Sequence, residues 1–365
     1  MSTLGFFPWL HISDAIDLPP FRLVPYERSK LPGSSVQATI DILLEPYLDT
    51  TKPIRRATVV QVDGRAPFDD LGEGEVVQFF RFRDLVAVSG IARREFFGMG
   101  IRYCNRDNFV LVIQNFDKER PASSISRTSR RRDGSSKTII SRSANVVRRP
   151  AHVSSNFSCT LDEPLVAALL VGQRKLHDWA RFEDAIRFYN DANSDDDQVL
   201  EQAEAVYMVS AFERLLDCRR GKEEDLVRRF LGVWRITECV LPRTGSRTSV
   251  GAKRMLTENW LRDFYRHRGS YAHGKLTASH PLVWPLKEHL LLGSYLFPRL
   301  LKSVLAKSGV YTLTEQDQRE ADLFEHLARE DLLTPTTDPD GNAEWPWDRV
   351  RADYLWRRCL GVGII

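Results

Sequence analysis

The spacing of apolar residues changes at one point in this chain, near Thr160, and this change constrains the fold most. Before it, apolar residues form short runs separated by Gly, Pro and Asp, a pattern typical of strands. After it, they recur at every third or fourth position, which is typical of amphipathic helices. Strands followed by helices indicate an α+β protein. We therefore expect a β-rich N-terminal domain, an antiparallel sheet or sandwich, followed by an all-α helical bundle.

Residues 1–120 form the predicted β-rich domain. No combination of residue types in it indicates catalysis, so we expect it to serve recognition or dimer contacts. The predicted strands are Val36–Leu48, Ala57–Asp63, Glu75–Phe82, Leu85–Ile91 and Phe109–Phe116.

A basic segment follows these strands. Pro121–Pro150 holds eight Lys and Arg residues against the single acid Asp133, with many Ser and few large apolar residues. Such a composition cannot bury enough surface to offset chain entropy, so we expect a flexible linker or loop over 121–158. The segment is either a solvated linker or an RNA or DNA contact, since clustered cations attract polyanions. Arg130, Arg131 and Arg132 are the candidate RNA contacts.

The remaining chain is predicted to be helical, with a bundle over 159–310 and a C-terminal helical extension over 311–365. A capping box at Thr160–Glu163 begins the first helical pattern. The later predicted helices are Val199–Cys218, Glu223–Leu241, Lys253–Arg268, Pro285–Lys307, Glu315–Leu333 and Asp348–Leu360.

Composition excludes several classes of protein. No apolar stretch approaches the roughly 18 residues of a membrane span, and the first residues do not read as a secretory signal. The five Cys are odd in number and contain no C-x-x-C pair, which argues against a zinc site or a disulfide framework. We therefore expect a cytoplasmic protein with no membrane association, metal or cofactor. The net charge of +3 names no partner, and an Arg-rich genome could account for the 41 Arg among 52 basic residues.

Arg268 is the basic residue whose position is hardest to explain by packing alone. It follows Trp260 and Phe264 at four-residue steps, which places its guanidinium on a helix face with two large aromatic side chains. A cation there is costly unless a carboxylate, a phosphate or carbonyl groups receive it. Gly269 and Ser270 weaken the helix, so we expect it to end near Arg268.

His273 would then lie just beyond the helix, close to Arg268. A histidine can move protons near neutral pH while a permanent cation holds phosphate charge, and both are needed to cleave a phosphodiester. The Arg-x4-His spacing alone is weak, because it also occurs at Arg262 and His267. The apolar helix face and the His-Gly that closes the motif distinguish Arg268 and His273.

Tyr265-x-x-Arg268-Gly-Ser-Tyr-Ala-His273-Gly resembles the Arg-x4–6-His signature of HEPN domains, particularly the ApeA-like branch. The segment Ala211-Phe-Glu-Arg-Leu-Leu216 resembles a second element of that branch, and the resemblance covers roughly residues 160–308. It implies a metal-independent endoribonuclease with a composite cleft between two protomers. In that family the 2′-hydroxyl attacks the adjacent phosphate, leaving a cyclic phosphate and a 5′-hydroxyl.

Carried to this chain, the resemblance implies His273 as general acid and base and Arg268 as phosphate clamp. Glu213 would be the carboxylate that orients Arg268. One departure is Gly269, where family members usually have a polar residue directly after the Arg. The implied partners are RNA, possibly tRNA, a second copy of the chain, and a phage or cellular trigger sensed by the N-terminal domain. The implied role is that of a toxin-like or anti-phage effector.

Other interpretations of these residues stay open. Arg268 and Glu213 could form a purely structural ion pair, and His273 could bond the last helix carbonyls. Ser270, Tyr271 and His267 are candidate substrate-binding residues, although Tyr271 could serve packing and His267 could be solvated. The rival functions are a non-catalytic RNA-binding or scaffold protein and a plain interaction adaptor.

Overall fold

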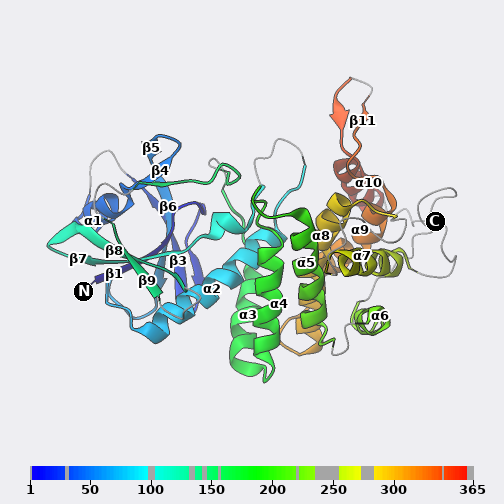
Figure 1. The fold of residues 1–365 in the computed structure, drawn as a ribbon, viewed down its shortest axis with the longest axis horizontal. Coiled ribbons are helices and arrows are strands. Elements are labelled where there is room, and N and C mark those ends of the chain that lie inside the picture. Colours follow the sequence, from blue (N-terminus) through cyan, green and yellow to red (C-terminus); the bar gives the residue numbers. More distant parts are fainter. Residues whose placement is uncertain are drawn as a thin grey trace. The chain divides into compact units, whose positions relative to one another are not determined.

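The structure is a computed structural model, and the chain divides into two compact units (Figure 1). The first comprises Met1–Arg94 with Ile101–Asp162, and the second comprises Glu95–Gly100 with Glu163–Ile365. The structure describes residues 2–28, 33–97, 103–130, 136–141, 146–154, 158–218, 222–234, 255–272, 283–338 and 341–359, with only the backbone described at 123–130, 136–141 and 357–359.

The first unit is built on a seven-stranded sheet in the order β2-β3-β6-β1-β7-β8-β9. Every neighbouring pair is antiparallel, which confirms the predicted N-terminal antiparallel sheet and the α+β class. A small second sheet has the order β10-β4-β5. The strands are β1 (Ser2–Phe7), β2 (Ile16–Leu18), β3 (Phe21–Glu27), β4 (Tyr47–Asp49), β5 (Lys52–Pro53), β6 (Arg56–Val62), β7 (Val112–Asp117), β8 (Arg120–Arg130), β9 (Ser136–Ser141) and β10 (Val147–Arg148).

Two helices replace three of the predicted strands. Helix α1 (Ser35–Leu44) occupies most of the Val36–Leu48 run, and helix α2 (Glu73–Ala92) occupies both Glu75–Phe82 and Leu85–Ile91, so these strand predictions are wrong. In α1, Ser34 accepts a hydrogen bond from the Gln37 amide and caps the helix. In α2, every residue from Asp84 to Ile91 is buried, which hides the helical period in the sequence.

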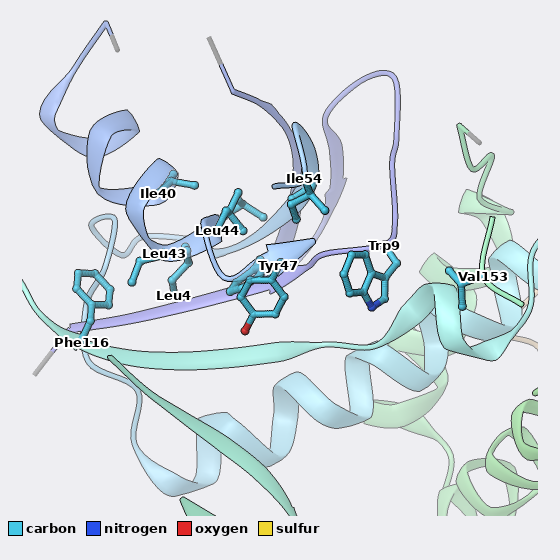
Figure 2. Packing of buried hydrophobic residues seen from close by; sticks show 12 residues of the cluster. Leu4, Trp9, Ile40, Leu43, Leu44, Tyr47, Ile54, Phe116 and Val153 are labelled. Carbon is cyan, nitrogen blue, oxygen red and sulfur yellow. The ribbon is translucent and has the colours of Figure 1, made fainter. Parts of the chain in front are cut away.

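The sheet carries apolar side chains on both faces. On one face, Leu4 and Phe6 of β1 belong to a buried cluster with residues of α1, and Figure 2 shows Ile40, Leu43 and Leu44 of α1 beside Leu4. On the other face, Phe21 of β3 stacks on Phe82 of α2 with ring centroids 4.3 Å apart. Gly5 of β1 lies so close to Phe79 of α2 that a Cβ there would meet the ring at 2.5 Å. The sheet is therefore the central layer between α1 and α2.

The basic segment 121–158 differs from the predicted linker. It contains most of β8 together with β9 and β10, and the first unit extends through it to Asp162. Strands β7, β8 and β9 pair through backbone hydrogen bonds, which a polar, Ser- and Arg-rich sequence can make without a large apolar face. Residues 131–135, 142–145 and 155–157 lie outside the described part.

The second unit is helical, as predicted. Phe324 of α9 packs edge-on against Trp260 of α7, with ring centroids 5.3 Å apart, so 311–365 joins the same unit as the bundle. Phe97, which precedes the helical region in the chain, stacks on Trp345. The helices are α3 (Glu163–Lys175), α4 (Trp179–Asp191), α5 (Glu201–Leu215), α6 (Glu223–Leu231), α7 (Leu256–Ala272), α8 (Leu286–Lys307), α9 (Glu315–Arg329) and α10 (Pro346–Cys359), with a hairpin of β11 (Thr336–Thr337) and β12 (Ala343–Glu344). Within the described ranges, none of the helices has the length and apolarity to cross a membrane.

Candidate functional site on helices α5 and α7

Helix α7 continues past its predicted end. Gly269 and Ser270 lie inside it, and the helix ends at Ala272. Among the described residues, no atom lies within 4 Å of where a Cβ at Gly269 would be. The Ser270 hydroxyl bonds to the Arg266 carbonyl one turn earlier at 3.5 Å, so the hydroxyl has a partner within the helix itself. His273, the next residue in the sequence, lies outside the described residues.

Arg268 is held by a carboxylate of the neighbouring helix α5. Its terminal nitrogen Nη2 lies 3.0 Å from Oε2 of Glu213. The Arg268 side chain is 23% exposed and that of Glu213 14%, so the pair lies at the edge of the bundle. The predicted contact between Glu213 and Arg268 is confirmed, whereas their role in catalysis stays a prediction.

Tyr265 completes this cluster of polar groups. The Arg268 guanidinium carbon lies 5.7 Å from the centre of the Tyr265 ring, which is within cation–π distance. Burial raises the pKa of Tyr265, and the adjacent Glu213 carboxylate, through its charge and a hydrogen bond, raises it further against the opposing charge of Arg268. Tyr265 therefore keeps its proton at physiological pH and can serve as a hydrogen-bond donor.

Two polar atoms in the cluster are closed to solvent and lack a hydrogen-bond partner within the described part of the chain. They are Oε1 of Glu213 and Nε of Arg268. Buried polar atoms in folded proteins are nearly always hydrogen-bonded, so such atoms need an explanation. The ion pair between the two side chains fixes the position of both atoms.

The other predicted substrate-binding residues of α7 are largely enclosed. His267 is 1% exposed, so the interpretation of a solvated His267 is wrong. Its Nε2 lies 2.6 Å from the Tyr271 hydroxyl, and its ring lies edge-on to His289 of α8 at 5.4 Å. Ser270 is 5% exposed. The structure therefore gives His267, Ser270 and Tyr271 partners inside the protein, and substrate binding by them stays a prediction.

A buried hydrogen-bond network next to His267 was missed by the sequence analysis. Oδ2 of Asp263 accepts hydrogen bonds from the backbone amides of Val283 (3.1 Å) and Trp284 (3.2 Å). It also lies 3.1 Å from Nε2 of His289. This carboxylate joins α7 to the start of α8. The only sequence signal was a polar residue among apolar ones, with Asp263 four residues before His267.

Two other arginines of α7 bind helix α6. Arg262 and Arg266 both contact Glu223, each with a shortest nitrogen–oxygen distance of 2.8 Å. Burial opposes ionisation of Glu223, but the hydrogen bonds from Arg266 and Arg262 outweigh it and hold the Glu223 pKa below its ordinary value. Arg266 thus has the same kind of contact as Arg268, a carboxylate on another helix, and it provides a matched control.

Acid pH is expected to destabilise the protein through His267. Burial, and then the neighbouring His289, lower the pKa of His267 from 6.5 to about 4, against the opposing charge of Asp263. Below pH 6.5 the unfolded chain takes up a proton on this histidine that the folded protein does not. The free energy of unfolding is therefore highest above pH 6.5 and decreases as the pH falls toward 4. At pH 5 the loss is about 2 kcal/mol. Urea unfolding between pH 5 and pH 7 measures this effect. The free energy of unfolding should depend less on pH in His267→Gln than in the wild type.

The control for this experiment is His177→Gln, because His177 is exposed. That variant should keep the pH dependence of the wild type, and other titrating groups cancel in the comparison. Equal pH dependence of all three proteins would show that His267 is not buried in its neutral form.

The predicted RNA contacts Arg130, Arg131 and Arg132 belong to the part of the chain assigned to the first unit. Arg130 is the last residue of β8, and Arg131 and Arg132 lie outside the described residues. Their contact with RNA stays a prediction. Within the described ranges, no group of three or more His, Cys, Asp or Glu residues is arranged to hold a metal ion.

Comparison with known proteins returned no similarity: no family model, no curated protein and no solved structure matches this chain.

Proposed function

We propose that this protein is a metal-independent endoribonuclease of the HEPN type. The observation that carries the proposal is the Arg268–Glu213 ion pair, at the end of α7 that leads directly to His273. The ion pair supports the proposal because it is a contact between the two sequence elements that resemble this family. These elements lie on separate helices, and Arg268 is oriented by the carboxylate that the resemblance assigned to it.

The proposed chemistry divides the work between two side chains. The RNA 2′-hydroxyl attacks the adjacent phosphorus, and the bond from phosphorus to the 5′ oxygen breaks. The products are a 2′,3′-cyclic phosphate and a 5′-hydroxyl. His273 transfers the protons at the attacking and leaving oxygens, and Arg268 stabilises the negative charge on the phosphate. Because Glu213 already holds one edge of the guanidinium, little reorientation is needed when the phosphate binds.

The biological part of the proposal rests on the sequence resemblance alone. Two copies of the chain bring their Arg268–His273 motifs to one cleft, the N-terminal unit senses a phage or cellular trigger, and the nuclease acts in the cytoplasm on RNA such as tRNA. Overexpression in bacteria should then be toxic, and a mass measurement in solution should give a dimer.

Cleavage of RNA in the presence of EDTA tests the proposed function. Purified protein should cut total RNA or tRNA without divalent metal and leave 2′,3′-cyclic phosphate ends. A labelled nucleotide cannot be ligated to such a 3′ end until an enzyme opens the cyclic phosphate and removes it. His273→Ala, purified in the same way, should not cleave. A requirement for divalent metal, or cleavage that survives in His273→Ala, would contradict the proposal.

One observation favours a non-catalytic alternative, an RNA-binding or scaffold protein with the same fold. Gly269 stands where the resembled family usually has a polar residue directly after the Arg, and none of the described residues places an atom within 4 Å of a Cβ there. In that case the protein should bind RNA without cleaving it, and its affinity for RNA should fall steeply as the salt concentration rises. Absence of both binding and cleavage would favour an interaction adaptor, in which the Arg268–Glu213 pair is structural.

A further inference from the structure

The first unit contains a cavity that the sequence analysis did not anticipate. It has a volume of about 550 Å³ and lies where the turn between β4 and β5 meets the start of β6 and the segment after β1. Small-molecule sites typically measure roughly 300–1,000 Å³. The cavity is therefore large enough for a ligand the size of a nucleotide. Its lining includes Pro8, Trp9, His11, Glu27, Asp49, Thr50, Lys52, Ile54, Arg55, Arg56 and Arg149.

The charged residues of this lining are four cations and two carboxylates. Nε of Arg149 lies 2.9 Å from Oδ1 of Asp49, and Arg56 lies 3.5 Å from Glu27. The remaining two cations are Lys52 and Arg55, which are exposed and have no carboxylate within ion-pair distance among the described residues. Two positive charges in excess, at the mouth of a concave site, favour an anionic ligand.

His11 presents a neutral hydrogen-bonding group in the same cavity. Its Nδ1 is closed to solvent and has no hydrogen-bond partner in the described part of the chain. Burial, and then the charge of Arg56, lower the pKa of His11 to about 4, while Asp49 opposes the shift. The ring is therefore neutral at physiological pH. His11 therefore adds no charge to the lining, and the excess of two positive charges comes from the Lys and Arg side chains.

The cavity also has an apolar part and a strained turn. Trp9 is 4% exposed and lines the cavity together with Pro8 and Ile54. Thr50, in the turn between β4 and β5, has a φ of 60°, a conformation that a β-branched residue rarely adopts. Strained backbone tends to cluster at active sites and ligand-binding segments.

We propose that this cavity binds a phosphorylated small molecule of nucleotide size. Lys52 and Arg55 contact the phosphate, and the uncharged part of the ligand lies against Pro8 and Trp9. This site belongs to the first unit and does not depend on the nuclease proposal. Its chemistry, cations at the mouth beside an apolar wall, fits a phosphate ester better than a free phosphate ion.

Titration calorimetry on the full chain, with AMP, ATP, adenosine and inorganic phosphate as probes, tests this proposal. AMP or ATP should bind with one site per chain. Adenosine and inorganic phosphate should each bind at least about tenfold more weakly, because each lacks one half of the contacts. The double variant Lys52→Ala/Arg55→Ala should weaken nucleotide binding at least about tenfold. Both side chains are exposed, so the variant should fold normally.

The matched control is Lys118→Ala/Arg120→Ala, which removes two exposed cations at the turn between β7 and β8. It should bind nucleotide like the wild type, and so should Arg268→Ala, which separates this site from the proposed nuclease. The proposal is overturned if neither nucleotide binds, if adenosine binds as tightly as AMP, or if the two double variants lose affinity equally.

Discussion

Arg268→Ala is expected to slow RNA cleavage by about 10²–10³-fold, with a much larger effect on kcat than on KM. The reason is that Arg268 is proposed to stabilise charge that develops in the transition state, and losing one such donor typically has this cost. Arg268→Lys should recover only part of the rate, because an ammonium group cannot bridge Glu213 and a phosphate as a planar guanidinium does. Single-turnover cleavage of a labelled RNA, at saturating protein, measures this effect.

Arg266→Ala is the matched control for this experiment. Arg266 lies on the same helix and contacts Glu223 of α6, as Arg268 contacts Glu213 of α5. Removing it takes the same charge from α7 and breaks the same type of ion pair, so cleavage should stay near the wild-type rate. Equal losses in the two variants would indicate a general effect on α7, and full activity of Arg268→Ala would remove Arg268 from the mechanism.

Asp263→Ala is expected to lower the free energy of unfolding of the helical unit by about 3–5 kcal/mol. The substitution leaves the amides of Val283 and Trp284 and the ring of His289 without their acceptor, all at the junction of α7 and α8. For a unit of this size the loss corresponds to a fall in Tm of roughly 10 °C. Thermal unfolding followed by circular dichroism measures it.

Asp178→Ala serves as the comparison for Asp263→Ala. Asp178 is 54% exposed and pairs with Arg181 on the surface, where such an ion pair contributes about 1 kcal/mol or less. Asp263→Asn, which keeps one oxygen acceptor, should lie between the two. A loss under about 1 kcal/mol for Asp263→Ala would mean that the three donors find other partners.

Much of the helical unit could be predicted from the sequence, because amphipathic helices leave a clear periodic pattern. The contact of Arg268 with Glu213 was implied by the family resemblance, whereas its place on an apolar face required only a carboxylate, a phosphate or carbonyl groups to receive it. The end of α7 could not be predicted. Gly269 and Ser270 favour a helix end locally, but the helix continues to Ala272, with His267 and Ser270 buried in its last turns.

The N-terminal unit shows where sequence patterns fail. Helix α2 was mistaken for two strands because nearly all of its second half is buried, so polar residues do not mark an exposed side. The cavity near His11 was missed for another reason. Its lining comes from segments as distant in sequence as Trp9, Arg55 and Arg149, and only the fold brings them together.

The way in which the chain divides into units limits how the protein can be dissected. The chain passes from one unit to the other at Arg94–Glu95, returns at Gly100–Ile101, and passes again at Asp162–Glu163. A fragment that begins near residue 159 would therefore lack Phe96 and Phe97, whose rings pack against Trp345 and Trp347. A proteolytic cut at Asp162–Glu163 would separate residues 163–365 from the first unit but leave residues 95–100 covalently attached to it. Deletion experiments that assign trigger sensing to one unit and cleavage to the other should retain residues 95–100 with the helices.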